Sequence, residues 1–225
     1  MRGLLIKDLK LMRNQKMFLV ILILLGLVFL FTQDNSYTAI GYMTMMCAMF
    51  SVTTFTYDEI DNGNAYLFTL PFSRKDYVKE KYIFALTGCL FGFLISIVLS
   101  VITSVVKVQI LSIPFEFGWM TVVRLSMVIA SVCVLFVAAS IPVEIKLGVE
   151  KGRIGLVIIM VIFFSGYYLI MEAIEIFGGK NPLVFFQKFM NFQMVTIAGI
   201  MVCIWVVVLG VSMLVSVRFI NRKEY

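Results

Sequence analysis

Acidic and basic side chains, the residues that could do chemistry, are concentrated in one stretch of this sequence. Residues 57–82 (YDEIDNGNAYLFTLPFSRKDYVKEKY) contain five acids and four bases between two long apolar runs. The chain has no histidine, which excludes HExxH zinc sites, Ser-His-Asp triads and histidine proton relays. A phosphate-binding P-loop is also missing, since the Gly179-Lys180 pair is followed by Asn181. The polar stretch is therefore better suited to docking a partner than to catalysis.

The cysteines give no sign of a metal site or a disulfide framework. All four lie inside apolar runs and none belongs to a CxxC pair. They are Cys47, Cys89, Cys133 and Cys203. We read them as small packing or lipid-facing residues, and we expect no metal, cofactor or catalytic residue on this chain.

The apolar runs indicate a membrane protein. Of the 225 residues, 61% are hydrophobic, against about 45–50% in soluble domains. A helix needs about 20 apolar residues to cross a bilayer, and six segments meet or approach that length. They are residues 17–32, 38–56, 82–106, 121–143, 154–176 and 194–217. We predict one all-α integral membrane domain over residues 1–225, with six transmembrane helices.

The distribution of Lys and Arg predicts the orientation of these helices. Fifteen of the 19 basic residues fall on alternate connections: the amino-terminal segment, residues 58–81, residues 144–153 and the tail 218–225. The positive-inside rule then places both termini and both basic loops in the cytoplasm. Because the bases are scattered between apolar runs, the net charge of +6 does not indicate nucleic acid as a partner.

Residues 1–16 have the pattern of an amphipathic interfacial helix lying on an anionic leaflet. Apolar residues share one side of a helical projection and basic residues lie mostly on the other. The apolar set is Leu4, Leu5, Leu9 and Met12, and the basic set is Arg2, Lys7, Lys10 and Arg13. Asp8 interrupts the apolar arc, and we expect it to cap or pair locally.

A stripe of small residues runs along the third apolar segment. Gly88, Gly92, Ser96, Ser100 and Ser104 recur at every fourth position and include a GxxxG pair. Such a stripe lets another helix approach closely. The pattern leaves open whether that helix belongs to the same bundle or to a second subunit.

Helix signals divide the polar stretch into two parts. Ser73 and Asp76 have the spacing of a capping box, which predicts that a helix starts directly after Ser73. The preceding Pro71-Phe72 pair marks a break. Residues 58–70 would then form one polar unit, and the helix from Ser73 onward would enter the membrane.

The opposite side of the membrane has one acidic feature. Glu172 and Glu175 lie three residues apart on one helical face, followed by the helix-breaking sequence GGKNP at residues 178–182. Residues 183–192 are apolar enough to form a re-entrant element outside. The two acids could form an outer gate or simply a solvated helix end.

Three parts of the chain resemble the short six-helix permeases of type-2 ABC exporters. The first is YLFTLPFSRK at residues 66–75, followed by Val78 and Lys81-Tyr82. The others are Lys7-Asp8-Leu9 near the start and, between helices four and five, Ile141-Pro142, Lys146, Gly148, Glu150, Lys151, Gly152 and Arg153. The resemblance extends over essentially the whole chain and includes exporters of peptide antibiotics and phenol-soluble modulins.

The resemblance implies a transport subunit of the bacterial cytoplasmic membrane with two kinds of protein partner. One is a second permease, identical or paralogous, and the other is a cytoplasmic ABC ATPase that binds ATP and Mg²⁺. A coupling helix between helices two and three would dock into the ATPase. The implied contact residues are Asp58, Glu59, Asp61, Asn62, Asn64, Tyr66, Leu67, Leu70, Glu150, Lys151 and Arg153.

In relatives, the second and fifth helices line the substrate path between protomers. The residues that would do so here are Tyr42, Met45, Met46, Met49 and Thr53, with Phe164, Tyr167, Tyr168 and Met171 opposite them. Methionine adapts to varied apolar shapes, which favours an amphipathic or apolar cargo. Ordinary packing and lipid contact would explain the same pattern.

These observations predict the permease of an ATP-driven exporter for an amphipathic substrate, preferably a peptide. Lipid or drug efflux is the alternative within transport. A membrane sensor or immunity protein that binds a peptide without moving it belongs to a different class. An integral membrane enzyme is disfavoured because histidine and a clustered acid site are missing.

Overall fold

The computed structural model describes residues 2–32, 36–59, 63–110, 119–178 and 194–222. Nearly all of these residues are helical and none of them forms a strand, as the sequence predicts. The helices are α1 (Arg2–Asn14), α2 (Lys16–Thr32), α3 (Ser36–Val52), α4 (Thr54–Glu59), α5 (Gly63–Leu67), α6 (Arg74–Ile110), α7 (Trp119–Gly178) and α9 (Met194–Arg222).

The helices include several that can cross a membrane. Within the described residues, four segments are long and apolar enough, namely Ala39–Glu59, Arg74–Gln109, Val122–Gly148 and Ala198–Arg222. A fifth is added if α1 and α2, which are bent by 66° relative to each other, form one broken span. The chain is therefore a multi-pass membrane protein. The expected total of six spans and the cytoplasmic placement of the termini stay predictions.

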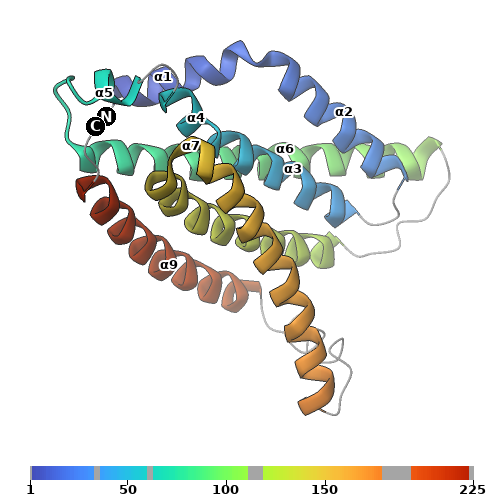
Figure 1. Ribbon diagram of the computed structural model, residues 1–225. Coiled ribbons are helices and arrows are strands. Elements are labelled where there is room, and N and C mark those ends of the chain that lie inside the picture. The colour runs from blue at the N-terminus through green and yellow to red at the C-terminus, as the bar shows by residue number, and fades with distance from the viewer. Residues whose placement is uncertain (1, 33–35, 60–62, 111–118, 179–193, 223–225) are drawn as a thin grey trace.

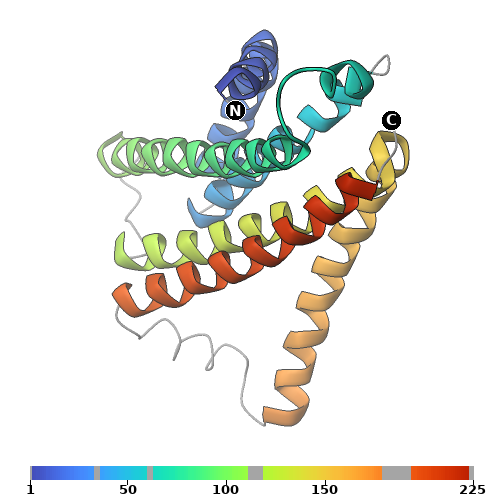
Figure 2. The ribbon, with the colours of Figure 1, turned by 90° about the vertical axis from the view of Figure 1, so that its left-hand side faces the viewer.

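Both termini lie at the same end of the bundle, which we call the terminal end. Helices α1, α4 and α5 and the beginning of α6 are gathered there (Figure 1). The first half of α7 runs beside α9, and the second half of α7 leaves the bundle (Figures 1 and 2). Polar elements are thus collected at one end of an otherwise apolar assembly.

The small-residue stripe of α6 packs against α3 of the same chain. A Cβ added to Gly92 would lie 2.7 Å from the Cβ of Cys47 and 3.3 Å from the carbonyl oxygen of Met43. Farther along the stripe, Ser96 and Ser104 are buried. The stripe therefore serves packing within this chain, which decides between the two possibilities that the sequence left open.

A core of apolar side chains lies near the terminal end, where α3, α6, α7 and α9 meet. Its members include Val52, Val78, Val137, Ile141 and Ile220, and all of them are buried. Because lipid tails are as apolar as these side chains, they stabilise the bundle through close van der Waals packing. This core packs the end of α3 against the start of α6, the two helices between which the polar segment lies.

Helix α7 contains a break at Gly148, where φ is 72° and ψ is 177°. The sequence suggested a cytoplasmic loop over residues 144–153. Instead, these residues are helical apart from the break at Gly148. Good helix formers such as Lys146 and Lys151 lie on either side of the break. The change in chain direction is therefore confined to Gly148.

Candidate coupling site

The polar segment between α3 and α6 begins and ends at well-defined local structures. Helix α4 follows α3 after Thr53, and α6 begins at Arg74. The backbone N–H of Asp76 donates to the Ser73 hydroxyl oxygen at 3.1 Å, and the backbone N–H of Ser73 donates to the Asp76 carboxylate at 3.3 Å. This is the predicted capping box, and it fixes the start of α6.

A buried ion cluster lies behind this segment, formed by Lys7 and Asp8 of α1, Asp58 of α4 and Lys81 of α6. The ammonium nitrogen of Lys81 lies 2.6 Å from Asp8 Oδ2 and 2.7 Å from Asp58 Oδ2. All three of these side chains are buried. The cluster therefore joins three helices that are far apart in the sequence.

Lys7 closes the cluster on its outer side. Its ammonium group pairs with Asp58 and lies 3.3 Å from Asp8 Oδ1. Burial alone would lower the pKa of Lys7, but the carboxylates of Asp58 and Asp8 outweigh this effect and raise it above its ordinary value. Lys7 and Lys81 are thus both paired with the two aspartates, and the Lys7 side chain is 31% exposed.

Neutral groups complete the surroundings of Lys81 and Asp58. The Tyr77 hydroxyl donates to Asp58 Oδ2 at 3.0 Å, and Lys81 donates to Thr54 Oγ1 at 3.0 Å. The Lys81 ammonium also lies 5.1 Å from the centroid of the Phe55 ring, within range of a cation–π interaction. Glu80 is fully buried next to Lys81 and Asp8.

The structure separates the predicted ATPase-contact residues into an inner and an outer set. Asp58 and Leu67 are buried, whereas Tyr66 is 73% exposed and Leu70 is 42% exposed. We call Tyr66 and Leu70 the docking patch. Lys151, on α7, is exposed as well.

Other predicted contact residues are placed only in part. A Cβ on Gly148 would lie 3.2 Å from Glu59 Oε2, so α4 touches α7 at its break. Asp61 and Asn62 lie outside the described residues, as do the side chains of Asn64, Glu150 and Arg153.

The predicted substrate path is described for α3 only. Tyr42, Met45, Met46 and Met49 are half-buried and Thr53 is exposed. Tyr42 and Met46 pack against a small cluster that includes Leu22 of α2. Met45 and Met49 are half-buried and do not belong to that cluster.

The opposite wall of the path stays a prediction. The side chains of Phe164, Tyr167, Tyr168 and Met171 lie outside the described residues, although their backbone is helical. Of the proposed outer gate, Glu172 is exposed and the Glu175 side chain is not described.

Sequence reasoning missed most of the ion cluster, because Lys7, Asp8, Tyr77 and Lys81 received no role in it. One signal was available: Asp8 lies on the apolar side of α1, and a carboxylate on a buried face needs a partner of opposite charge. The local partner Lys7 satisfies only part of that need, since Asp8 also pairs with Lys81. The expectation of purely local pairing was therefore incomplete.

The sequence of this chain matches a known protein family. A family model described as ABC-2 family transporter protein matches residues 3–221. Searches of curated proteins and of solved structures found no match to this chain. The family match includes the ion cluster, the docking patch and every described helix.

Proposed function

Since the chain belongs to the ABC-2 family of transporter proteins, it is a membrane permease of an ABC transporter, and we propose that it exports an amphipathic peptide. The energy would come from ATP hydrolysed by a separate cytoplasmic ATPase subunit. One observation carries this proposal: the segment between α3 and α6 is held from inside by the ion cluster and presents Tyr66 and Leu70 outward.

The docking patch has the character of a protein interface. Exposed aromatic and aliphatic side chains gain free energy when a partner removes them from water, and tyrosine is enriched among the residues that dominate binding. Tyr66 and Leu70 flank the turn after α5, where backbone hydrogen bonds join Thr69 to Tyr66 and Leu70 to Leu67 at 3.1 and 3.2 Å. A rigid turn with apolar side chains is suited to a groove on the ATPase.

The ion cluster gives this contact a way to act on the membrane helices. Asp58 of α4 and Lys81 of α6 are joined directly, and Asp8 ties α1 to the same point. Helix α6 continues for 37 residues, or about 55 Å at 1.5 Å per residue, more than the bilayer core of about 30 Å. A movement of α4 would therefore be passed to a helix that crosses the membrane.

The proposed cargo follows from the side of α3 that carries Met45 and Met49. These side chains are half-buried, and flexible thioethers adapt to apolar surfaces of varied shape. The family typically pairs two permeases, and a homodimer or a paralogous heterodimer would place this side of α3 between protomers. A peptide with one apolar face could then pass between them.

Co-purification with candidate ATPase subunits, followed by transport in inverted vesicles, tests the proposal. The variant Tyr66→Ala/Leu70→Ala should lower ATPase retention about tenfold, which corresponds to about 1.4 kcal/mol. The matched control is Leu94→Ala/Val98→Ala, because both residues are exposed on the apolar part of α6. This control should retain the ATPase.

Transport is read as ATP-dependent accumulation of a fluorescent amphipathic helical peptide inside the vesicles. Equal ATPase retention in the docking-patch variant and the control would refute the docking surface. Accumulation of a labelled lipid or an apolar drug without accumulation of the peptide would refute the proposed cargo. Binding of the peptide without accumulation would instead indicate a sensor.

A further inference from the structure

Arg74 joins the start of α6 to the end of α9. Its guanidinium donates to the Ile220 carbonyl oxygen at 2.9 Å and to the Asn221 carbonyl oxygen at 3.5 Å. Because α9 ends at Arg222, these carbonyls belong to its last turn, whose oxygens lack partners within the helix. A cation at this position also opposes the negative end of the helix dipole. Arg74 therefore caps α9 from another helix.

The same guanidinium contacts the turn after α5 that carries the docking patch, which we call the docking turn. Its central carbon lies 5.7 Å from the centroid of the Phe68 ring, within range of a cation–π interaction. Phe68 lies between Tyr66 and Leu70 in the sequence. A guanidinium is planar, so its face can cover a ring while its N–H groups donate sideways. Arg74 thus contacts the docking turn and α9 at the same time.

A second contact between α6 and α9 lies farther into the bundle. The Tyr82 hydroxyl lies 2.9 Å from Ser216 Oγ, and both side chains are buried. At 1.5 Å per residue, Ser216 precedes Ile220 by about 6 Å along the helix axis, whereas α9 extends about 33 Å in the other direction, to Met194. Helix α9 therefore has a short arm at the terminal end and a long arm in the membrane-spanning part.

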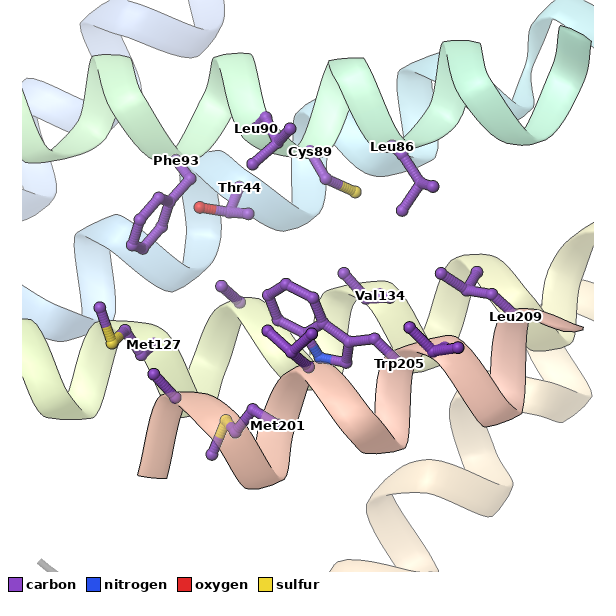
Figure 3. Close-up of a pocket in the computed structure, with 14 residues that line it drawn as sticks. Thr44, Leu86, Cys89, Leu90, Phe93, Met127, Val134, Met201, Trp205 and Leu209 are labelled. Atoms are coloured by element: carbon purple, nitrogen blue, oxygen red, sulfur yellow. The ribbon is translucent and has the colours of Figure 1, made fainter. Parts of the chain in front are cut away.

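The long arm of α9 has room to tilt. Helices α6 and α9 diverge away from the terminal end (Figures 1 and 2). An apolar cavity of about 430 Å³ lies between them, with side chains of α3 and α6 on one wall and side chains of α7 and α9, including Trp205, on the other (Figure 3). Packed protein interiors resist compression, so a helix can move more easily where it borders an open space.

We propose that Arg74 is a positioning residue through which the docking turn tilts α9. A movement of the docking turn would pull on the last turn of α9, and the contact between Tyr82 and Ser216 would act as the pivot. With arms of about 6 and 33 Å, a displacement of about 1 Å at Ile220 becomes about 5 Å at the other end of α9. The ATPase as the source of this movement rests on the proposed function, whereas the link itself rests on the contacts of Arg74.

Spin labels on α6 and α9 measure this tilt. One is attached at Ile102→Cys, an exposed position far from the start of α6, and the other at the native Cys203, which is exposed whereas the other three cysteines are buried. The permease is placed in lipid nanodiscs, alone or with its ATPase subunit and a non-hydrolysable ATP analogue. In the parent, the ATPase should shift the distance between the labels. In Arg74→Gln the ATPase should still bind, but the shift should be lost.

Two further variants separate the geometry of Arg74 from its charge. Arg74→Lys keeps the charge, but a single ammonium group cannot cover the Phe68 ring and donate to the α9 carbonyls together, so the shift should be lost here as well. Lys75→Gln removes an exposed positive charge next to Arg74 and should behave like the parent. Without the ATPase, Arg74→Gln should broaden the distance distribution, because α9 has lost a contact with α6.

A shift that persists in Arg74→Gln, or that is absent from the parent complex, would overturn the proposal. Arg74→Lys equal to the parent would also overturn it, since charge alone would then suffice. The same holds if Arg74→Gln loses the ATPase as Tyr66→Ala/Leu70→Ala does, because Arg74 would then only shape the docking turn. If the parent retained no ATPase, the export proposal would fail, and the permease alone would still decide the link: equal widths in the parent and Arg74→Gln would refute it.

Discussion

The Lys81 ammonium of α6 lies 2.6 Å from the Asp8 carboxylate of α1, and both side chains are inaccessible to solvent. The two residues are 73 positions apart in the sequence. Charges removed from water are stable only when they are paired and hydrogen-bonded. This pair therefore ties the amino-terminal helix to the third apolar segment and depends on Asp58 and Lys7 for balance.

Replacing Lys81 by methionine tests how far the cluster holds these helices together. Lys81→Met preserves much of the side-chain volume but leaves Asp8 and Asp58 with Lys7 as the only cation of the cluster. We expect a loss of about 3–5 kcal/mol in the free energy of unfolding, as for other buried pairs that lose one member. The measurement is denaturant unfolding of the purified protein in detergent, followed by circular dichroism.

Lys79→Met is the matched control, because Lys79 is an exposed lysine on the same helix. Its unfolding free energy should stay within about 0.5 kcal/mol of the parent. If Lys81→Met also stayed within that limit, the cluster would not contribute to stability. A double-mutant cycle with Asp8→Asn would then separate the direct pair from its surroundings.

The sequence predicted the elements that depend on local patterns. The Ser73-Asp76 box gave the start of α6, and the spacing of Gly88, Gly92 and the serines identified a packing surface. Apolar runs predicted the four described segments that are long and apolar enough to cross a membrane. These features are readable because each depends on neighbours within about four residues along the chain.

Features that depend on distant partners could not be read in the same way. Asp58 lies in a polar stretch of the sequence. Only the fold shows that its side chain is buried and paired with Lys81 and Lys7. The cavity around Trp205 requires the divergence of α6 and α9, which no local pattern encodes. Around Gly148 the sequence predicted a loop over residues 144–153, whereas the structure continues the helix on both sides of a break at this one glycine.

Close contact between α3 and α6 predicts a different response at two glycines. In Gly92→Ala the new methyl would lie 2.7 Å from Cys47 Cβ and 3.3 Å from the Met43 carbonyl oxygen, so the helices must separate. We expect a loss of about 1–3 kcal/mol. Thermal unfolding monitored by circular dichroism measures it.

Gly210→Ala is the control for this substitution. A Cβ at Gly210 meets no described atom within 4 Å, and alanine favours a helix over glycine by about 1 kcal/mol. Its unfolding temperature should therefore stay the same or rise. An unfolding temperature of Gly92→Ala equal to that of the parent would contradict the tight α3–α6 contact.

Gly148 predicts that the direction of the second half of α7 depends on one residue. Its φ of 72° and ψ of 177° belong to a backbone region that is essentially restricted to glycine. Alanine there would cost about 1–3 kcal/mol, and its methyl would lie 3.2 Å from Glu59 Oε2. The helix can relieve this strain by straightening, which would move its second half away from α4.

Spin-label distances between Lys75→Cys and Ile158→Cys measure this movement, because both positions are exposed. The background carries Cys203→Ser, since Cys203 is an exposed native thiol whereas Cys47, Cys89 and Cys133 are buried. Gly148→Ala should shift the distance distribution and lower the unfolding temperature. Gly166→Ala is the control, because a Cβ there meets no described atom within 4 Å, and it should change neither. An unshifted distribution together with an unchanged unfolding temperature in Gly148→Ala would show that the break does not depend on glycine.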